Sequence, residues 1–124
     1  MTAEKIIREY LDASSERRMS EAASFLADGA VLAFPQGRFD DLEEMAAAMS
    51  GRYRIISKTY VTWDVMEGDH ETVVVTTGTL SGVNTHGVAF ADVRFCDRFV
   101  VRDGQIWEQH VWNDLAESGV LDQA

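Results

Sequence analysis

Residues 95–114 read FCDRFVVRDGQIWEQHVWND, and this stretch decides the fold. It predicts two long strands joined at Arg102-Asp103-Gly104-Gln105, because Asp-Gly readily takes the positive φ values that a tight hairpin turn requires. When the first strand is extended back towards the N-terminus, alternate residues form an apolar face that contains one acid: Gly87, Ala89, Ala91, Val93, Phe95, Asp97, Phe99 and Val101. Asp97 is therefore the residue whose position most needs an explanation.

The sequence before this hairpin predicts helices first and strands afterwards. Apolar residues at helical spacing predict a helix over residues 3–17, a second short helix capped by Ser20, and a third that begins at Asp41 and ends at Ser50-Gly51. The segment AVLAFP, closed by Pro35, predicts a short strand between the last two helices. From Arg52 onward β-branched and aromatic residues dominate, and four strands are expected: Tyr53–Glu67, Glu71–Ser81, His86–Val101 and Gln105–Asp114.

Short polar connections make these four strands antiparallel neighbours. The sequence therefore predicts a single α+β domain over residues 1–124, with a cone-shaped, strongly curved antiparallel sheet and three N-terminal helices packed on its concave face. The interior of such a cone is the expected site for a ligand.

The charge and composition of the chain argue against several classes of binding partner. The net charge is −10, with 21 acids against 11 basic residues and no cluster of Lys and Arg, which argues against a nucleic-acid partner. No apolar run approaches the roughly 20 residues of a membrane span, and MTAEKIIREY lacks the positive and then apolar opening of a signal peptide. Cys96 is the only cysteine, which favours a reducing compartment. We expect a cytoplasmic protein with no nucleic-acid or membrane partner.

Asp97 has two interpretations on an apolar strand face. A buried carboxylate without partners costs several kcal/mol, so it must be protonated, paired or hydrogen-bonded. In the functional interpretation it is a neutral acid or a polarising donor at the floor of a pocket, with Tyr10 from the first helix beside it. In the structural interpretation the backbone, Arg94 or Arg98 satisfies the carboxylate, and Tyr10 is then a packing residue.

The order of these residues resembles the nuclear transport factor 2-like fold, in its SnoaL-like and ketosteroid isomerase-like branch. The resemblance covers nearly the whole chain, and its features are REYLDAS, FLADGAVLAFP, RFCDRFVVRDGQI and the final VWND. It implies that Tyr10 and Asp97 bind an enolate oxygen, as the matching Tyr and Asp of ketosteroid isomerase do. The position of that enzyme's proton-moving base is Phe34 here, which cannot accept a proton. Limonene epoxide hydrolase is similar around DGQI, but the acid that it needs falls on Val111.

The predicted pocket has further members on the same faces of the strands. Those expected to contact a ligand are Phe34, Trp63, Phe95, Phe99, Gln109, Val111 and Asn113. His110 lies on the opposite strand face with Trp112, and it becomes the best general base only if a bulge reverses the register of that strand. The histidines are far apart in the sequence, so we predict no metal site.

We therefore predict a protein that binds a small hydrophobic, carbonyl-bearing molecule in an apolar pocket. It acts as an isomerase, cyclase or dehydratase without a cofactor, with Asp97 as the acid or donor, Tyr10 assisting, and Gln109 or Asn113 orienting the ligand. The alternative is a non-catalytic ligand-binding or dimerisation module, and a third possibility is an interaction protein that uses the outer sheet face. The large aromatic content predicts a homodimer through that outer face.

Overall fold

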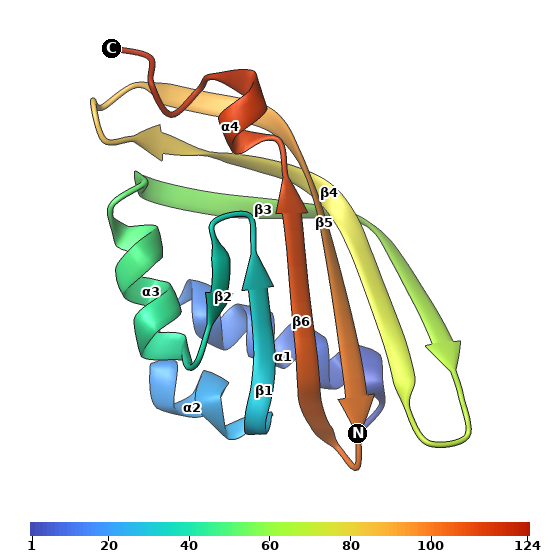
Figure 1. Cartoon of the computed structure of the whole chain (residues 1–124). Coiled ribbons are helices and arrows are strands. Elements are labelled where there is room, and N and C mark those ends of the chain that lie inside the picture. The colour runs from blue at the N-terminus through green and yellow to red at the C-terminus, as the bar shows by residue number, and fades with distance from the viewer.

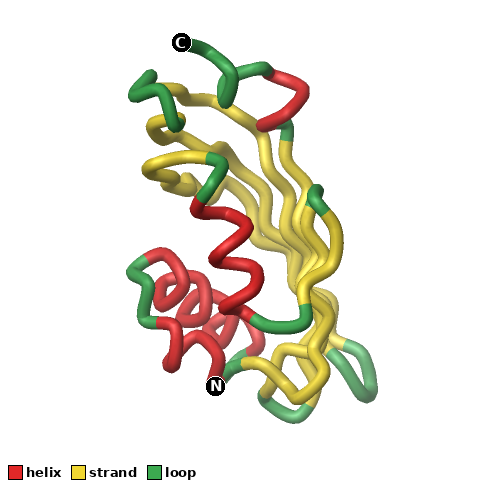
Figure 2. Tube along the Cα trace, turned by 60° about the vertical axis from the view of Figure 1, so that its left-hand side comes forward, coloured by secondary structure: helices red, strands yellow, loops and turns green.

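The computed structural model describes residues 1–124 and contains one six-stranded sheet with helices on one of its faces (Figures 1 and 2). The strand order is β2-β1-β6-β5-β4-β3. The elements are α1 (Ala3–Ser15), α2 (Met19–Ser24), β1 (Leu26–Phe34), β2 (Gly37–Phe39), α3 (Leu42–Ser50), β3 (Tyr53–Glu67), β4 (Thr72–Asn84), β5 (Ala89–Arg102), β6 (Gln105–Asn113) and α4 (Leu115–Ser118). The α+β class with N-terminal helices is confirmed.

The prediction of a wholly antiparallel sheet is wrong. β1 pairs with β6 in parallel, with Leu32 opposite Gln109, while the other neighbouring strands are antiparallel. A parallel pair needs a long crossover between its strands, and here everything from β2 to β5 provides it. Strong curling of the sheet is not found either. The edge strands β2 and β3 stand at opposite ends of the strand order, so the sheet bends around the helices but stays open (Figure 2).

The predicted bounds of several elements agree with the structure to within two residues, but β1 begins four residues before the predicted AVLAFP segment, β4 continues to Asn84 and not to Ser81, and β5 begins at Ala89 and not at His86. The β3 bounds are as predicted, and the Asp41 side chain caps α3 by accepting a hydrogen bond from the Glu44 backbone at 2.8 Å. α2 begins at Met19, with Arg18 and not Ser20 at its N-cap. Asp28-Gly29 lies inside β1, where the pairing register shifts, and does not end a helix. The short elements β2 and α4 carry too few residues to show a period, and the sequence analysis missed them.

The expected side-chain alternation on β5 breaks near the start of the strand. Ala89 and Ala91, predicted to face inward, are exposed, whereas Phe90 is buried. Leu80 pairs with Val93 and Gly82 with Phe90, so two residues of β5 oppose one of β4 in a β-bulge. From residue 93 onward the predicted inward face is observed: Val93, Phe95, Asp97, Phe99 and Val101.

The helix-covered face of the sheet carries two hydrophobic clusters. The larger joins α1 to β1, β4, β5 and β6, and includes Ile7, Tyr10, Leu32 and Phe99. The smaller lies on β4 and β5 under the C-terminal segment and contains Leu80, Phe90, Val93, Phe95 and Leu115. Between them, buried polar side chains stand on adjacent strands: Thr76, Asp97 and Gln109. These three side chains form a buried polar band across β4, β5 and β6.

Candidate functional site

A lysine that the sequence analysis did not single out lies against Asp97. Asp97 is fully buried on β5, opposite Thr76 of β4 and Val111 of β6. The Nζ atom of Lys58, on β3, donates a hydrogen bond to Asp97 Oδ2 and forms an ion pair with it. About a quarter of the Lys58 side chain, 26%, remains exposed, while the Asp97 side chain has no exposed surface. Lys58 is thus the member of the pair that solvent, or a ligand, meets first.

The arginines proposed as structural partners of Asp97 are not its partners. Arg94 pairs with Asp114 at 2.7 Å, and Arg98 approaches Glu108 at 3.9 Å. Successive side chains of a strand point to opposite faces, which places both arginines on the outer face of the sheet. The signal that was available is the same alternation on β3, where Lys58 lies between Ile56 and Tyr60 on the half-buried face.

The gap that lets Lys58 reach Asp97 is at Gly78 of β4. In the strand pairing Lys58 lies opposite Leu80, and Asp97 lies opposite Thr76, so the lysine side chain extends diagonally past Gly78. A methyl group on Gly78 would lie 1.9 Å from the backbone oxygen of Thr59 and 3.0 Å from the ring of Phe95. Because position 78 has no side chain, the space above this part of β4 is filled by side chains of the neighbouring strands, such as Phe95.

The Asp97 carboxyl is electrostatically perturbed and incompletely bonded. Burial raises the pKa of Asp97, because an ionised group is poorly solvated there, and the charge and hydrogen bond of Lys58 oppose that rise. The second oxygen, Oδ1, is buried and has no hydrogen-bond partner. A carboxyl whose pKa is raised can hold or release a proton closer to neutral pH than an exposed one can.

Tyr10 is close to this pair but is bonded elsewhere. Its hydroxyl donates a 2.5 Å hydrogen bond to Gln109 Oε1, and its ring meets Phe99 edge-on at 6.1 Å between centroids. Burial raises the pKa of Tyr10, and the Asp97 charge adds to the effect. The structure therefore brings Tyr10, Gln109 and Asp97 together, with Tyr10 held by Gln109 and not hydrogen-bonded to Asp97.

Aromatic rings surround the exposed side of Lys58. Its Nζ atom lies 4.8 Å from the centroid of the Phe95 ring, within the range of a cation–π contact. Tyr60 packs edge-on against Phe95 at 5.8 Å and lies 5.2 Å from Trp63. The ammonium group thus lies at one end of a row of three aromatic rings on β3 and β5.

The other predicted ligand contacts are divided among several environments. Val111 is buried directly opposite Asp97, and Phe99 is fully buried in the larger cluster. Phe34 packs edge-on against Phe39 at 5.8 Å, away from the Lys58–Asp97 pair in the strand order. Asn113 is half-buried, and its side-chain oxygen accepts a hydrogen bond from the Leu115 backbone at 3.2 Å.

The register reversal that would make His110 a general base is not found. His110 lies on the outer face, where it is hydrogen-bonded to Glu108 at 2.9 Å and stacked on Trp112. β6 does contain a bulge, but it falls at Trp107, because Val100 pairs with Glu108 and Val101 with Ile106. That bulge leaves Gln109 and Val111 buried on the helix-covered face.

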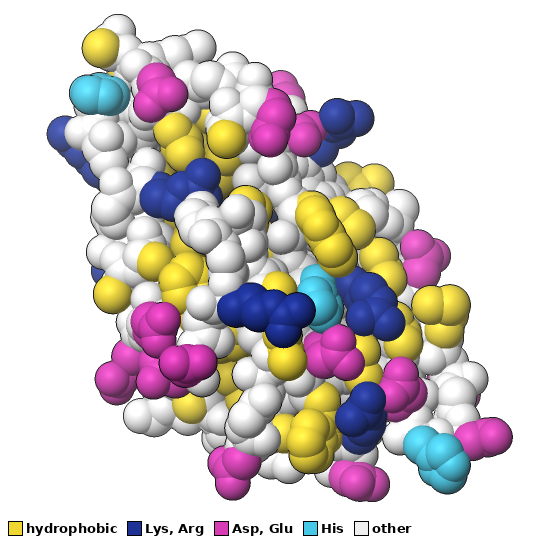
Figure 3. Space-filling model, viewed as in Figure 1, with side chains coloured by type: hydrophobic (Ala, Val, Ile, Leu, Met, Phe, Trp, Pro, Cys, Tyr) yellow, Lys and Arg dark blue, Asp and Glu magenta, His cyan; other side chains and the backbone are white.

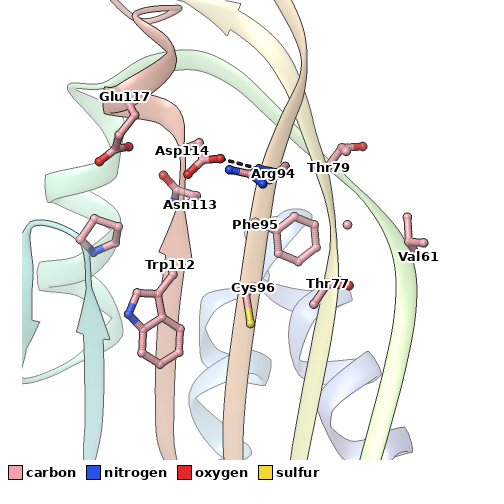
Figure 4. Close-up of a pocket in the computed structure, with 12 residues that line it drawn as sticks. Val61, Thr77, Thr79, Arg94, Phe95, Cys96, Trp112, Asn113, Asp114 and Glu117 are labelled. Carbon is pink, nitrogen blue, oxygen red and sulfur yellow. Dashed lines mark hydrogen bonds and ion pairs between the residues drawn. The ribbon is translucent and has the colours of Figure 1, made fainter.

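One surface hollow lies on the outer face, and its lining does not include Asp97 or Tyr10. It has a volume of about 700 Å³, and its lining includes Val61, Thr77, Arg94, Cys96 and Trp112 (Figure 4). On the helix-covered side, members of the two hydrophobic clusters lie on either side of Asp97 along β5. No three His, Cys, Asp or Glu side chains are grouped so as to hold a metal ion. None of the helices has the length and apolar character of a membrane-crossing segment.

Comparison with known proteins gives a family and a fold. A family model described as a SnoaL-like domain matches residues 7–109. No match was found among curated protein sequences. A nuclear transport factor 2-like protein of unknown function from Burkholderia pseudomallei K96243 has a similar structure, with a TM-score of 0.77, 17% identity, and coverage of 97% of this chain and 96% of that chain.

Two further solved structures with a similar fold are of candidate enzymes. A candidate ketosteroid isomerase from Shewanella frigidimarina NCIMB 400 superposes with a TM-score of 0.73 and 13% identity, covering 87% of this chain and 92% of that one. A candidate polyketide cyclase from Pseudomonas putida KT2440 gives a TM-score of 0.68 and 19% identity, covering 100% and 99%. At these identities the likeness concerns the fold alone.

Proposed function

This chain belongs to the SnoaL-like domain family, and from that premise we propose that it binds a small hydrophobic, carbonyl-bearing molecule beside Lys58 and moves protons on it without a cofactor. The observation that carries the proposal is the pairing of Lys58 with the buried Asp97. Proton transfer needs two polar groups near the ligand, and Phe34 occupies the position where the resemblance places a base. Lys58 supplies the second titratable group.

The pair has the features that enolisation requires. Asp97, whose pKa is raised by burial, takes a proton from the carbon next to the ligand's carbonyl group. The negative charge that develops on the carbonyl oxygen is stabilised by the Lys58 ammonium, which is preorganised by its bond to Asp97. Return of the proton at another carbon completes an isomerisation. In a cyclisation the enolate carbon attacks a second carbonyl group, and the alkoxide that forms takes the proton back from Asp97.

Tyr10 and Gln109 support this chemistry from the helix side. Their 2.5 Å hydrogen bond fixes both side chains next to Asp97 and separates the carboxyl from the helices. Tyr10 then acts by positioning its neighbours, because its hydroxyl proton is already committed to Gln109. The ring wall of Tyr60, Phe95 and Trp63 supplies the apolar surface against which the carbon skeleton packs.

The test is a turnover screen with matched variants. Purified protein is incubated with cyclic enones, 1,3-diketones and poly-β-ketone compounds, and ultraviolet absorbance reports the movement of a conjugated double bond. Asp97→Asn and Lys58→Met should each lower the rate by about 10²- to 10⁴-fold, the usual contribution of a positioned acid or base. Glu43→Gln, an exposed change on α3, is the control. Turnover that survives in both site variants would exclude the mechanism.

The position of Phe34 favours a second candidate function, a ligand-binding module without catalysis. Phe34 is half-buried against Phe39 and contributes packing where a base is expected from the resemblance. In that case Asp97 and Lys58 bind the carbonyl compound without changing it. Calorimetric binding of an enone that remains chemically unchanged over days would favour this alternative.

The outer face supports a further proposal, self-association. Around the outer hollow, Val61 and Trp112 are 68% and 54% exposed, and apolar side chains lie among basic and acidic ones (Figure 3). Arg94 and Asp114, which both line the hollow, form an ion pair there that balances the local charge. We propose that two copies of this acidic chain associate there, because repulsion between them is smallest where acids and bases are paired.

A further inference from the structure

We propose that the ligand of the Lys58–Asp97 pair carries a hydroxyl group on a carbon adjacent to its carbonyl group or one carbon further away. This inference rests on the proposed function and specifies its substrate class, the α- and β-hydroxy carbonyl compounds and their enolised forms. Such a molecule presents one acceptor oxygen and one hydroxyl donor side by side. The site offers the complementary arrangement, a free donor next to a free acceptor.

The free acceptor is Asp97 Oδ1. Of the two carboxyl oxygens, Oδ2 is bonded to Lys58, whereas Oδ1 is buried and has no partner. Buried polar atoms are almost always hydrogen-bonded, and one without a partner destabilises the folded state. The strand neighbours do not serve it: the Thr76 hydroxyl donates to the Thr62 backbone oxygen at 2.9 Å, and Val111 is apolar. A ligand hydroxyl would fill this vacancy in the hydrogen-bond network.

The free donors belong to Lys58. An ammonium group has three N–H donors, and Asp97 Oδ2 takes one of them. The Lys58 side chain is the partly exposed member of the pair, and its bond to Asp97 is the one hydrogen bond that its ammonium group makes, so the remaining donors are available to a ligand. A carbonyl oxygen is the natural acceptor for them, because it gains charge during enolisation.

The two vacancies are close enough to be filled by one small molecule. Asp97 Oδ1 and Oδ2 are bonded to the same carboxyl carbon, and Lys58 Nζ is hydrogen-bonded to Oδ2, so Oδ1 and Nζ are neighbours at one carboxyl group. Lys58 covers the carboxyl and has a flexible side chain, so a ligand reaches Oδ1 when the ammonium pivots about Oδ2. The Phe95 ring, against which Tyr60 packs edge-on, lies beside the ammonium group and offers an apolar surface to the ligand.

The site should therefore distinguish carbonyl ligands by the position of their hydroxyl group. A ligand with the carbonyl group alone leaves Oδ1 unsatisfied, and a site built around a hydrogen bond rejects the analogue that lacks it. A hydroxyl on the far side of the ring adds polarity without reaching Oδ1. We expect the ligand with its hydroxyl beside the carbonyl group to bind about 10- to 100-fold more tightly than the ligand without a hydroxyl or the one with a distant hydroxyl.

Isothermal calorimetry with four bicyclic probes tests this directly. The probes are tetralone, the isomer with a hydroxyl on the carbon beside the carbonyl, the isomer with a hydroxyl at the far benzylic carbon, and the tetralol without a carbonyl. The first hydroxy isomer should bind most tightly to the unaltered protein. Asp97→Val, with folding checked by circular dichroism, should abolish its advantage over tetralone while tetralone itself still binds.

The outcomes separate this inference from the proposed function. If tetralone and both hydroxy isomers bind with equal affinity, and Lys58→Met weakens all three alike, carbonyl binding stands and the hydroxyl requirement is wrong. If none of the four probes binds, both proposals fail. The comparison among probes uses the unaltered protein, so it does not depend on whether the Asp97 variant folds.

Discussion

Replacing Lys58 by Met should destabilise the protein in a manner that depends on pH. The change removes the only charged partner of Asp97 and keeps the apolar part of the side chain. Breaking a buried ion pair by removing one member costs about 3–5 kcal/mol. Lys58 is about a quarter exposed, so water already screens part of the interaction, and we expect about 2–3 kcal/mol of lost unfolding free energy at neutral pH.

The sign of the pH dependence follows from the direction of the Asp97 shift. Burial raises the pKa of Asp97 above its unfolded value, so between those two pKa values the folded protein binds a proton that the unfolded chain releases. The contribution of Asp97 to stability therefore decreases as pH rises through that window and is constant above it. Lys58 opposes the rise in pKa, and its removal extends the window to higher pH. Each further unit by which the folded-state pKa of Asp97 rises lowers the free energy of unfolding by about 1.4 kcal/mol once Asp97 is ionised.

The assay is urea unfolding followed by circular dichroism at about pH 5 and about pH 8. It compares the unaltered protein, Lys58→Met, Asp97→Asn and the double variant. The penalty of Lys58→Met should be larger at the higher pH and should nearly vanish in the Asp97→Asn background, giving a coupling energy of about 2 kcal/mol. Equal stability of Lys58→Met and the unaltered protein at both pH values would refute the argument, as would an equal penalty with and without the carboxylate.

Three further perturbations test other parts of the structure. The buried Asn84 side chain accepts hydrogen bonds from two backbone N–H groups of the β4–β5 turn and donates to two backbone carbonyls of the C-terminal segment. Asn84→Ala should therefore lower the free energy of unfolding by about 2–4 kcal/mol and accelerate amide exchange in residues 115–124. Unchanged exchange in those residues would contradict this role. Tyr10→Phe should cost about 1–3 kcal/mol in urea unfolding by leaving Gln109 Oε1 without its donor, and a stability equal to that of the unaltered protein would show that water replaces the hydroxyl. Trp112→Glu should convert the proposed dimer to a monomer in sedimentation at micromolar concentration, whereas an unaltered protein that is already monomeric would remove the outer-face interface.

The sequence predicts the alternating pattern better than it predicts the partners across the sheet. Asp97, Phe99 and Gln109 are buried as expected, because a strand with one buried face repeats every two residues. The parallel pairing of β1 with β6 and the bulge at Asp92 were missed. Pairing direction depends on how a long connection returns to the sheet, and a bulge depends on the partner strand, so neither has a strong local signal.

The missed lysine shows why the candidate site needed the structure. Lys58 and Asp97 lie on strands separated by β4 and are offset along them, since Lys58 is level with Leu80 and Asp97 with Thr76. A search for partners of Asp97 on its own strand finds Arg94 and Arg98, which the alternation places on the wrong face. Between these two levels β4 has glycine at position 78, where a side chain would meet the Thr59 backbone and the Phe95 ring. The catalytic proposal therefore depends on three strands together: a carboxyl on β5, a lysine on β3, and the absence of a side chain between them on β4.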